Sequence, residues 1–142
     1  MKFAVRYQSH GGNTRAVAEI IAAVLGVEAK PVSVPLEEPA QILFLGGGVY
    51  AWHADRALSA FMRRLEPGAA ERVVAFSTTG SLDRTNAAIL EAMEKKGIPA
   101  ESGLCLKLGL QGNTIVGRKG GRLTGEQTAA VETFARAYLE QE

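Results

Sequence analysis

Short apolar runs alternate with segments of helical periodicity along most of the chain, and this alternation narrows the folds available to it. Two segments, 42–45 and 73–76, are apolar at consecutive positions, which is typical of strands buried on both faces. Such strands occur at the centre of parallel sheets that helices cover on two sides. The complete set of predicted strands is 3–7, 31–34, 42–45, 72–76 and 103–108.

Apolar residues recur at the i, i+3, i+4 spacing of an amphipathic helix in the segments between the strands. The helices are expected around 17–25, 58–65, 89–93 and 131–138. Gly26 follows the first of them at the position of a C-cap glycine. Thr124 and Gln127 have the spacing of a capping box at the start of the last.

The element order predicts an α/β fold. Alternating strands and helices favour a parallel sheet with right-handed crossovers. Five strands and four helices suit a three-layer sandwich whose five-stranded parallel sheet has the doubly wound order 2-1-3-4-5. The 142 residues are expected to form a single domain, residues 1–142. In such a sheet, ligands bind beyond the carboxyl ends of the strands where the strand order reverses, here after the first and third strands with the fourth nearby.

The first strand leads into "QSHGGNT", residues 8–14, directly before a helix. Free backbone N–H groups and the dipole at a helix start favour an anion, and adjacent glycines allow a close backbone approach. The Walker pattern requires Gly-Lys-Ser/Thr, and no lysine follows here. A tightly held phosphate ester therefore suits this segment better than a transferable phosphate. A plain strand-to-helix turn with an Asn cap remains the alternative.

Two further segments are expected at the same edge of the sheet. Residues 46–55, "GGGVYAWHAD", combine three glycines, which core packing does not explain, with two aromatic residues that could stack against a flat ring. Simple capping of the sheet edge by these rings is the alternative, and His53 is expected to begin the next helix. Residues 77–85, "STTGSLDRT", are rich in hydroxyl groups that suit hydrogen bonds to a heteroaromatic edge, or an N-cap for the helix that follows.

Composition and charge exclude several function classes. The formal net charge is +1, so bulk electrostatics give no case for nucleic acid or for an anionic membrane. The single cysteine, Cys105, cannot form an internal disulfide and is expected to be a buried, inert thiol. No apolar stretch is long enough to enter a membrane, and a cytoplasmic location is expected. No acid–base pair, nucleophile–base pair or metal-ligand cluster stands out.

The three segments, taken in order, resemble those of the flavodoxin family over essentially the whole chain. "SHGGNT" is similar to the family's phosphate loop, roughly Thr/Ser-x-Thr-Gly-x-Thr. "LGGGVYAW", residues 45–52, resembles its second flavin loop, and "FSTTG", residues 76–80, its third. The resemblance implies non-covalent FMN, with the phosphate in the first loop and the isoalloxazine ring between the other two. The implied cofactor-binding residues are Ser9, His10, Gly11, Gly12, Asn13, Thr14, Gly48, Val49, Tyr50, Ala51, Trp52, Ser77, Thr78, Thr79 and Gly80.

Three departures from the family pattern are visible. Gly11 stands where the family usually carries a second hydroxyl, and a hydrogen bond to a charged group is worth about 1.5–3 kcal/mol. The third segment contains no aromatic residue, so one face of the flavin is expected to be more open. Residues 107–122 carry four basic side chains and no acidic one, which indicates a long glycine-rich loop, either simply solvated or a docking surface for an anionic partner.

The resemblance implies a small electron-transfer protein that shuttles electrons through FMN between redox partner proteins, a reductase and an acceptor. An alternative is an FMN-dependent reductase of a small-molecule acceptor such as a quinone or a tetrapyrrole-like ring. A further alternative is a flavin-free binding module that kept the fold. A redox carrier is favoured over an enzyme, with no catalytic side chain, no metal, no nucleic acid and no membrane insertion.

Overall fold

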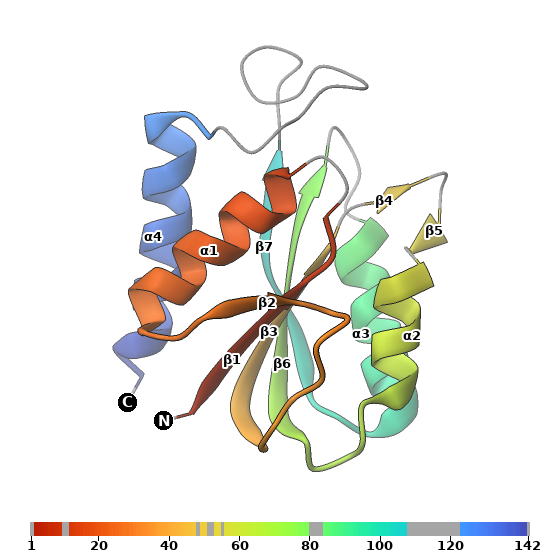
Figure 1. Cartoon of the computed structure of the whole chain (residues 1–142). Coiled ribbons are helices and arrows are strands. Elements are labelled where there is room, and N and C mark those ends of the chain that lie inside the picture. Colours follow the sequence, from red (N-terminus) through yellow and green to blue (C-terminus); the bar gives the residue numbers. More distant parts are fainter. Residues whose placement is uncertain are drawn as a thin grey trace.

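The computed structural model describes residues 2–9, 12–47, 49–50, 53–54, 56–79, 84–107 and 123–141. Five strands form a parallel sheet in the spatial order β2-β1-β3-β6-β7, with helices on both of its faces (Figure 1). These strands are β1 (Phe3–Tyr7), β2 (Ala29–Pro31), β3 (Ala40–Gly47), β6 (Ala70–Thr79) and β7 (Ala100–Lys107). Counted in chain order within the sheet, the arrangement is 2-1-3-4-5, so the predicted α/β fold is confirmed.

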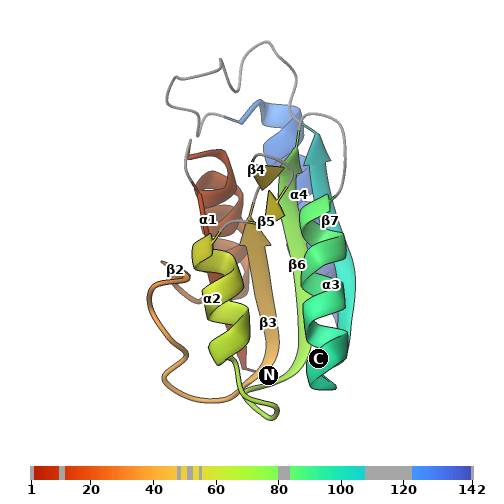
Figure 2. The ribbon, with the colours of Figure 1, turned by 90° about the vertical axis from the view of Figure 1, so that its right-hand side faces the viewer.

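The helices form two layers, one on each face of the sheet (Figures 1 and 2). They are α1 (Asn13–Leu25), α2 (Arg56–Arg64), α3 (Arg84–Lys96) and α4 (Gly125–Leu139). Along β3, Ile42 and Phe44 pack in the cluster with α1 and α4, while Leu43 and Leu45 pack in the cluster with α2 and α3. The central strands are therefore buried on both faces, as their continuous apolar runs predict.

Two predicted helix ends are confirmed. Gly26 adopts a left-handed conformation at φ 75°, and its backbone N–H bonds to the carbonyls at the end of α1. Thr124 and Gln127 form the capping box, with bonds of 2.9 Å from Thr124 N to Gln127 Oε1 and 3.1 Å from Gln127 N to Thr124 Oγ1. Within the described part of the chain, no helix has the length and hydropathy needed to cross a bilayer.

The predicted second strand, 31–34, is misplaced. The observed β2 ends at Pro31, where the prediction begins. The N–H of Val32 still donates to Tyr7 O at 2.8 Å, but the chain then turns beside the sheet. Arg6 of β1 holds this turn through backbone carbonyls, with Nε donating to Val34 O at 2.8 Å and Nη2 to Pro35 O at 3.0 Å. The turn that follows the strand is therefore held by a side chain from a distant part of the sequence.

Strands β3 and β6 extend further than their apolar runs predict. Gly46 and Gly47 belong to β3, and Ser77 and Thr78 belong to β6, where Gly47 pairs with Ser77. The segments predicted as loops after these strands therefore begin inside the sheet. Backbone hydrogen bonding to a neighbouring strand does not require an apolar side chain, so the ladder continues through glycine and hydroxyl residues.

An aromatic and ionic cluster attaches α4 to the sheet. Tyr138 is 6% exposed, and its ring contacts that of Phe44 edge to face with centroids 5.1 Å apart. Its hydroxyl donates to Glu101 Oε2 at 3.3 Å, and Arg72 Nη1 lies 3.2 Å from the other oxygen of that carboxylate. Burial, together with the charge and hydrogen bond of Glu101, raises the pKa of Tyr138 from 10.0 to about 12, with Arg72 opposing.

This raised pKa predicts a loss of stability at alkaline pH. The folded state holds the phenolic proton more tightly than the unfolded state does, so the stabilisation is present below about pH 10 and is lost as the pH rises from 10.0 to about 12. At about 1.4 kcal/mol per pKa unit, the shift corresponds to a loss of at most about 3 kcal/mol, because solvent screens part of the interaction. Urea unfolding between pH 9 and 12 measures it. Tyr138→Phe is expected to flatten this part of the pH profile, and an equally steep profile in that variant would contradict the assignment.

Candidate functional site

The carboxyl ends of β1, β3 and β6 lie together at one edge of the sheet. Gln8, directly after β1, donates its backbone N–H to Gly46 O at 3.0 Å. In the ladder, Tyr7 pairs with Gly46, and Gly46 pairs in turn with Phe76. The three segments that the sequence predicts to meet at this edge therefore start from adjacent strands.

The helix α1 begins at this edge without a side-chain cap. Its N-cap is Gly12, at φ 96° and ψ −10°, and no side chain accepts from its first turn as a cap. The Asn-cap alternative is wrong, because Asn13 is the first helical residue and not the cap. The backbone N–H of Gly12 donates to Ser9 Oγ at 3.0 Å, which places Ser9 beside the helix start.

The electrostatics of this helix start favour an anion. The first turn contains no acidic residue, so nothing there opposes the positive end of the helix dipole. Gly12 has a left-handed conformation that glycine adopts readily and that leaves no side chain at the cap position. The backbone N–H groups of a first helical turn have no acceptor inside the helix. The local structure therefore suits an anion bound by neutral donors.

Arg15 is the only cationic side chain in the first turn of α1, and it forms an ion pair with Glu19. Its Nε donates to Glu19 Oε1 at 2.7 Å, one turn along the exposed surface of the helix. This hydrogen bond, with the neighbouring negative charge, raises the pKa of Arg15 above its ordinary value. The guanidinium group and the carboxylate thus form a pair on the helix surface.

A buried hydroxyl pair connects the first segment with the third. Thr14 Oγ1 and Thr78 Oγ1 are 2.8 Å apart, and the two residues are 1% and 8% exposed. Either oxygen can donate; when Thr78 donates, the hydrogen of Thr14 is left for an acceptor at the helix start. The pair brings together residues 64 positions apart, one in the first turn of α1 and one near the end of β6.

Two of the three consecutive glycines serve core packing, contrary to the sequence-based expectation. A Cβ atom on Gly46 would lie 2.1 Å from Cε2 of Phe76, whose ring is fully buried. A Cβ atom on Gly47 would lie 2.9 Å from Leu58 Cδ2. The glycines at these two positions let an aromatic ring and a helix approach the sheet closely. Gly48, predicted as a cofactor-binding residue, lies outside the described residues.

The second segment contains a short hairpin that sequence reasoning missed. Strands β4 (Val49–Tyr50) and β5 (His53–Ala54) are antiparallel, with Val49 opposite Ala54 and Tyr50 opposite His53. The prediction that His53 begins the next helix is wrong, since α2 begins at Arg56. The Ala-Trp pair between these strands lacks the Asn-Gly signature of a two-residue hairpin turn, so no local signal identified it.

The structure describes the predicted site unevenly. Ser9, Gly12, Asn13, Thr14, Ser77 and Thr78 lie at the shared edge of the sheet, and the backbone of Val49, Tyr50 and Thr79 continues from it as strand. Ser77 and Thr78 are buried at the end of β6, as Thr14 is at the start of α1. His10, Gly11, Ala51, Trp52 and Gly80 lie outside the described residues, as does most of the basic segment 107–122.

Two buried polar residues at the start of α3 were not identified from the sequence. Asn86 is fully buried, and its Nδ2 donates at 3.0 Å to Ser102 Oγ and to Leu104 O of β7. These bonds span the irregularity at which the pairing of β6 with β7 shifts by one residue. Thr85 is 1% exposed, and its methyl carbon would lie 3.5 Å from a Cβ on Gly47. The only sequence signal was the adjacent Thr-Asn pair before an apolar helical stretch.

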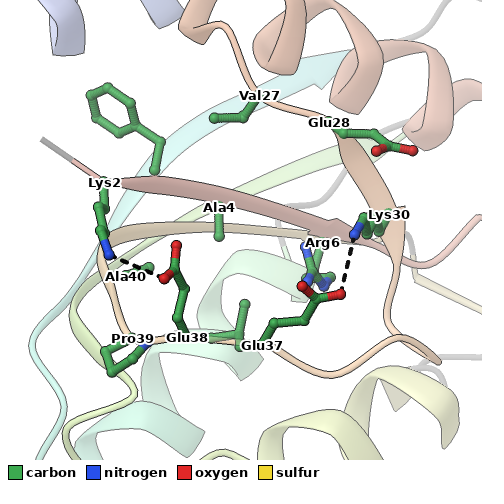
Figure 3. A pocket seen from close by; sticks show the side chains of 12 residues that line it. Lys2, Ala4, Arg6, Val27, Glu28, Lys30, Glu37, Glu38, Pro39 and Ala40 are labelled. Atoms are coloured by element: carbon green, nitrogen blue, oxygen red, sulfur yellow. Dashed lines mark hydrogen bonds and ion pairs between the residues drawn. The ribbon is translucent and has the colours of Figure 1, made fainter.

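A separate cavity of about 190 Å³ lies beside the amino-terminal half of β1 (Figure 3). Its charged side chains compensate one another, with Lys2 Nζ 3.1 Å from Glu38 Oε2 and Lys30 Nζ 3.8 Å from Glu37 Oε1. Arg6 donates to backbone carbonyls, and burial lowers the pKa of its guanidinium from the ordinary value. This cavity is distinct from the edge that carries the predicted site.

The family model described as a flavodoxin domain matches residues 4–135. The chain belongs to the flavodoxin family. Proteins of this family bind a flavin, usually FMN, and in general transfer electrons to redox partner proteins. A search of curated protein sequences finds no significant match.

Solved structures of flavodoxins have the same fold as this family member. A flavodoxin from the domain Archaea superposes with a TM-score of 0.76 at 18% identity, covering 99% of this chain and 98% of that one. Flavodoxin 2 from Bacillus cereus gives 0.68 at 16% identity, with both chains fully covered. The rubredoxin oxygen:oxidoreductase of Desulfovibrio gigas gives 0.70 at 13% identity, covering 95% of this chain but 34% of that one. At these identities the likeness concerns the fold alone.

Proposed function

We propose that this flavodoxin-family chain binds FMN non-covalently and carries electrons between redox partner proteins, a reductase and an acceptor. The observation that carries the proposal is the helix start of α1. Gly12 caps it in a left-handed conformation, its first turn has no acidic residue, and the Thr14–Thr78 pair joins it to β6. A helix N-terminus without a side-chain cap, beside two strand ends, is suited to the phosphate of a cofactor that extends across the sheet edge.

The residues present fit FMN by the chemistry of their donors. A phosphate ester is held by backbone N–H groups and hydroxyls at the start of α1, where no acidic side chain repels it. The residues proposed to hold the phosphate are Ser9, His10, Gly11, Gly12, Asn13 and Thr14. Those proposed to hold the ring are Gly48, Val49, Tyr50, Ala51, Trp52, Ser77, Thr78, Thr79 and Gly80.

The protein's part in this function is binding and orientation. When bound, FMN supplies reversible transfer of one or two electrons. The Thr14–Thr78 pair holds the start of α1 against β6, so the phosphate-binding end and the ring-binding end keep a constant separation. Gly46 and Gly47 keep the end of β3 close to the core, which positions the chain that follows. None of these roles requires a proton-transferring side chain.

Titration of the purified protein with FMN tests the proposal. Binding is expected to quench the fluorescence of the flavin and to shift its visible absorption bands. Riboflavin, which lacks the phosphate, is expected to bind more weakly. Absence of any spectral change on titration with FMN would overturn both the carrier and the reductase interpretations in favour of a flavin-free module.

The stacking role of Trp52, the only tryptophan in the chain, can be tested separately. Trp52→Ala is expected to weaken FMN and riboflavin binding alike and to restore part of the quenched flavin fluorescence, because a stacked indole quenches a flavin. Trp52→Phe serves as the conservative control and should retain most of the affinity. Unchanged affinity and quenching in Trp52→Ala would show that the indole does not contact the ring.

A further inference from the structure

A groove of about 370 Å³ runs between α2 and α3 on the face of the molecule opposite to α1 and α4. Figure 2 faces these two helices, which stand in front of β3 and β6. Small and apolar side chains contribute to its lining, namely Ser59, Met62, Ala88 and Ala92. Ala88 and Ala92 are one helical turn apart on α3, and Ser59 and Met62 are three residues apart on α2, so each pair lies along one face of its helix. The small size of Ser59, Ala88 and Ala92 leaves space for side chains from outside.

Charged residues line the rest of the groove. Arg63 and Lys95 are exposed, and Lys96 donates from Nζ to Arg63 O and Leu65 O, at 2.9 Å each. These two bonds tie the end of α3 to the carbonyl end of α2, so the spacing of the helices is set before anything binds. A preformed groove lowers the ordering cost of association. Glu91 is the one acidic residue in the lining, and it pairs with Lys95 at 3.4 Å.

The near-neutral net charge conceals an uneven distribution of charge between the two helical layers. The layer with the groove carries six cationic and two acidic side chains, which are Arg56, Arg63, Arg64, Arg84, Lys95, Lys96, Glu91 and Glu94. The opposite layer carries two cationic and three acidic ones, which are Arg15, Arg136, Glu19, Glu126 and Glu132. The two helices that form the groove therefore carry a net positive charge, which favours acidic groups over basic ones.

We infer that this groove docks an acidic amphipathic helix of a partner protein. Apolar residues of such a helix, spaced at i, i+3 or i+4 and i+7, would enter between α2 and α3, and its flanking carboxylates would face the cationic rim. A cavity of this size accommodates side chains, whereas a lipid surface requires a broad apolar or basic face. Nucleic acid requires phosphate contacts and stacking platforms rather than an apolar slot.

Docking in the groove does not require a bound cofactor. The residues proposed to hold FMN lie at the carboxyl ends of the strands, and none of them lines the groove. Binding of the partner helix to flavin-free protein therefore tests the docking surface independently of the redox function. Either proposal can fail while the other stands.

Two synthetic helical peptides provide the direct test. Both carry leucine at positions 1, 4, 8 and 11, and the other exposed positions are glutamate in one peptide and lysine in the second. The flavin-free protein is expected to bind the glutamate peptide, with amide NMR shift changes confined to α2 and α3 and an affinity that falls as salt is raised. Equal binding of the lysine peptide, or shift changes centred elsewhere, would overturn the proposal.

Variants of the groove sharpen the test. Ala92→Leu fills the groove, and the double variant Arg63→Glu/Lys95→Glu reverses the charge of its rim. Each is expected to weaken binding of the glutamate peptide at least about tenfold while the protein remains folded, which circular dichroism checks. Arg136→Glu, an exposed charge reversal on α4, is the matched control and should leave affinity within about twofold. Undiminished binding by both groove variants would overturn the proposal. The proposal would also be overturned if the protein bound vesicles containing phosphatidylserine, or duplex DNA, more tightly than the glutamate peptide and lost that binding in the double variant.

Discussion

Gly46→Ala is expected to lower the free energy of unfolding by about 3 kcal/mol, the upper end of the usual range for overpacking a core. The added methyl would lie 2.1–2.4 Å from three ring carbons of Phe76, which is fully buried. Gly46 and Phe76 are paired across β3 and β6, so the ring cannot move aside without disturbing the centre of the sheet. Alanine's smaller conformational freedom in the unfolded state opposes this loss by less than about 1 kcal/mol. Urea unfolding of the variant measures the difference.

A matched control and a rescue accompany this prediction. Gly125→Ala introduces the same methyl where no atom lies within 4 Å, and a stabilisation of no more than about 1 kcal/mol is expected. Phe76→Leu makes room for the methyl, so the double variant Gly46→Ala/Phe76→Leu should be more stable than the sum of the two single losses predicts. Should Gly46→Ala fail to fold, recovery of folding in the double variant would still support the explanation. A loss below about 1 kcal/mol, or additive single losses, would contradict it.

Thr14→Val is expected to have the largest effect on FMN binding among substitutions at the start of α1. Valine keeps the shape of threonine but removes the hydroxyl that bonds to Thr78 at 2.8 Å. A hydrogen bond to a charged group is worth about 1.5–3 kcal/mol, so FMN affinity should fall by about 10- to 150-fold. Riboflavin has no phosphate, and its affinity should change by much less. Parallel titrations with the two flavins measure this selectivity.

Thr78→Val is the control for that experiment, because it removes the same internal hydrogen bond from the other side. Both variants leave one buried hydroxyl without its partner and should lose similar stability, about 1–3 kcal/mol. Thr78 is proposed to lie on the ring side of the site, so its replacement should weaken FMN and riboflavin equally. Equal losses for both flavins in Thr14→Val would show that Thr14 does not contact the phosphate, even if FMN still binds.

The core and the ends of two helices could be predicted from the sequence because their signals are local. Consecutive apolar residues at 42–45 predict burial on both faces, and the structure divides them between the two hydrophobic clusters. A glycine after a helix, as at Gly26, and a Thr-x-x-Gln motif, as at Thr124, act within one or two turns of the chain. At these positions, residues close in the sequence form the hydrogen bonds that the free backbone N–H and C=O groups of a helix end require.

The candidate site was less predictable, because its parts depend on contacts between distant segments. The sequence placed the polar segments at the correct edge of the sheet but assigned Gly46, Gly47, Ser77 and Thr78 to loops. All four lie in strands, because backbone pairing with the neighbouring strands continues past the apolar residues. The sequence shows where an apolar run ends. The hydrogen-bonded pairing of two strands, however, ends where the neighbouring strand turns away from the sheet.

By itself, the sequence determined the order of the five sheet strands and the four helices, the burial of the central strands and the resemblance of three segments to a flavodoxin. These properties follow from periodicity and from short motifs, in which each residue acts on near neighbours in the chain. Only the tertiary structure decided that Phe76 excludes a side chain at Gly46, that Thr14 meets Thr78, and that α2 and α3 leave a groove. Each depends on the distance between segments that the sheet brings together, and that distance is a property of the packed molecule.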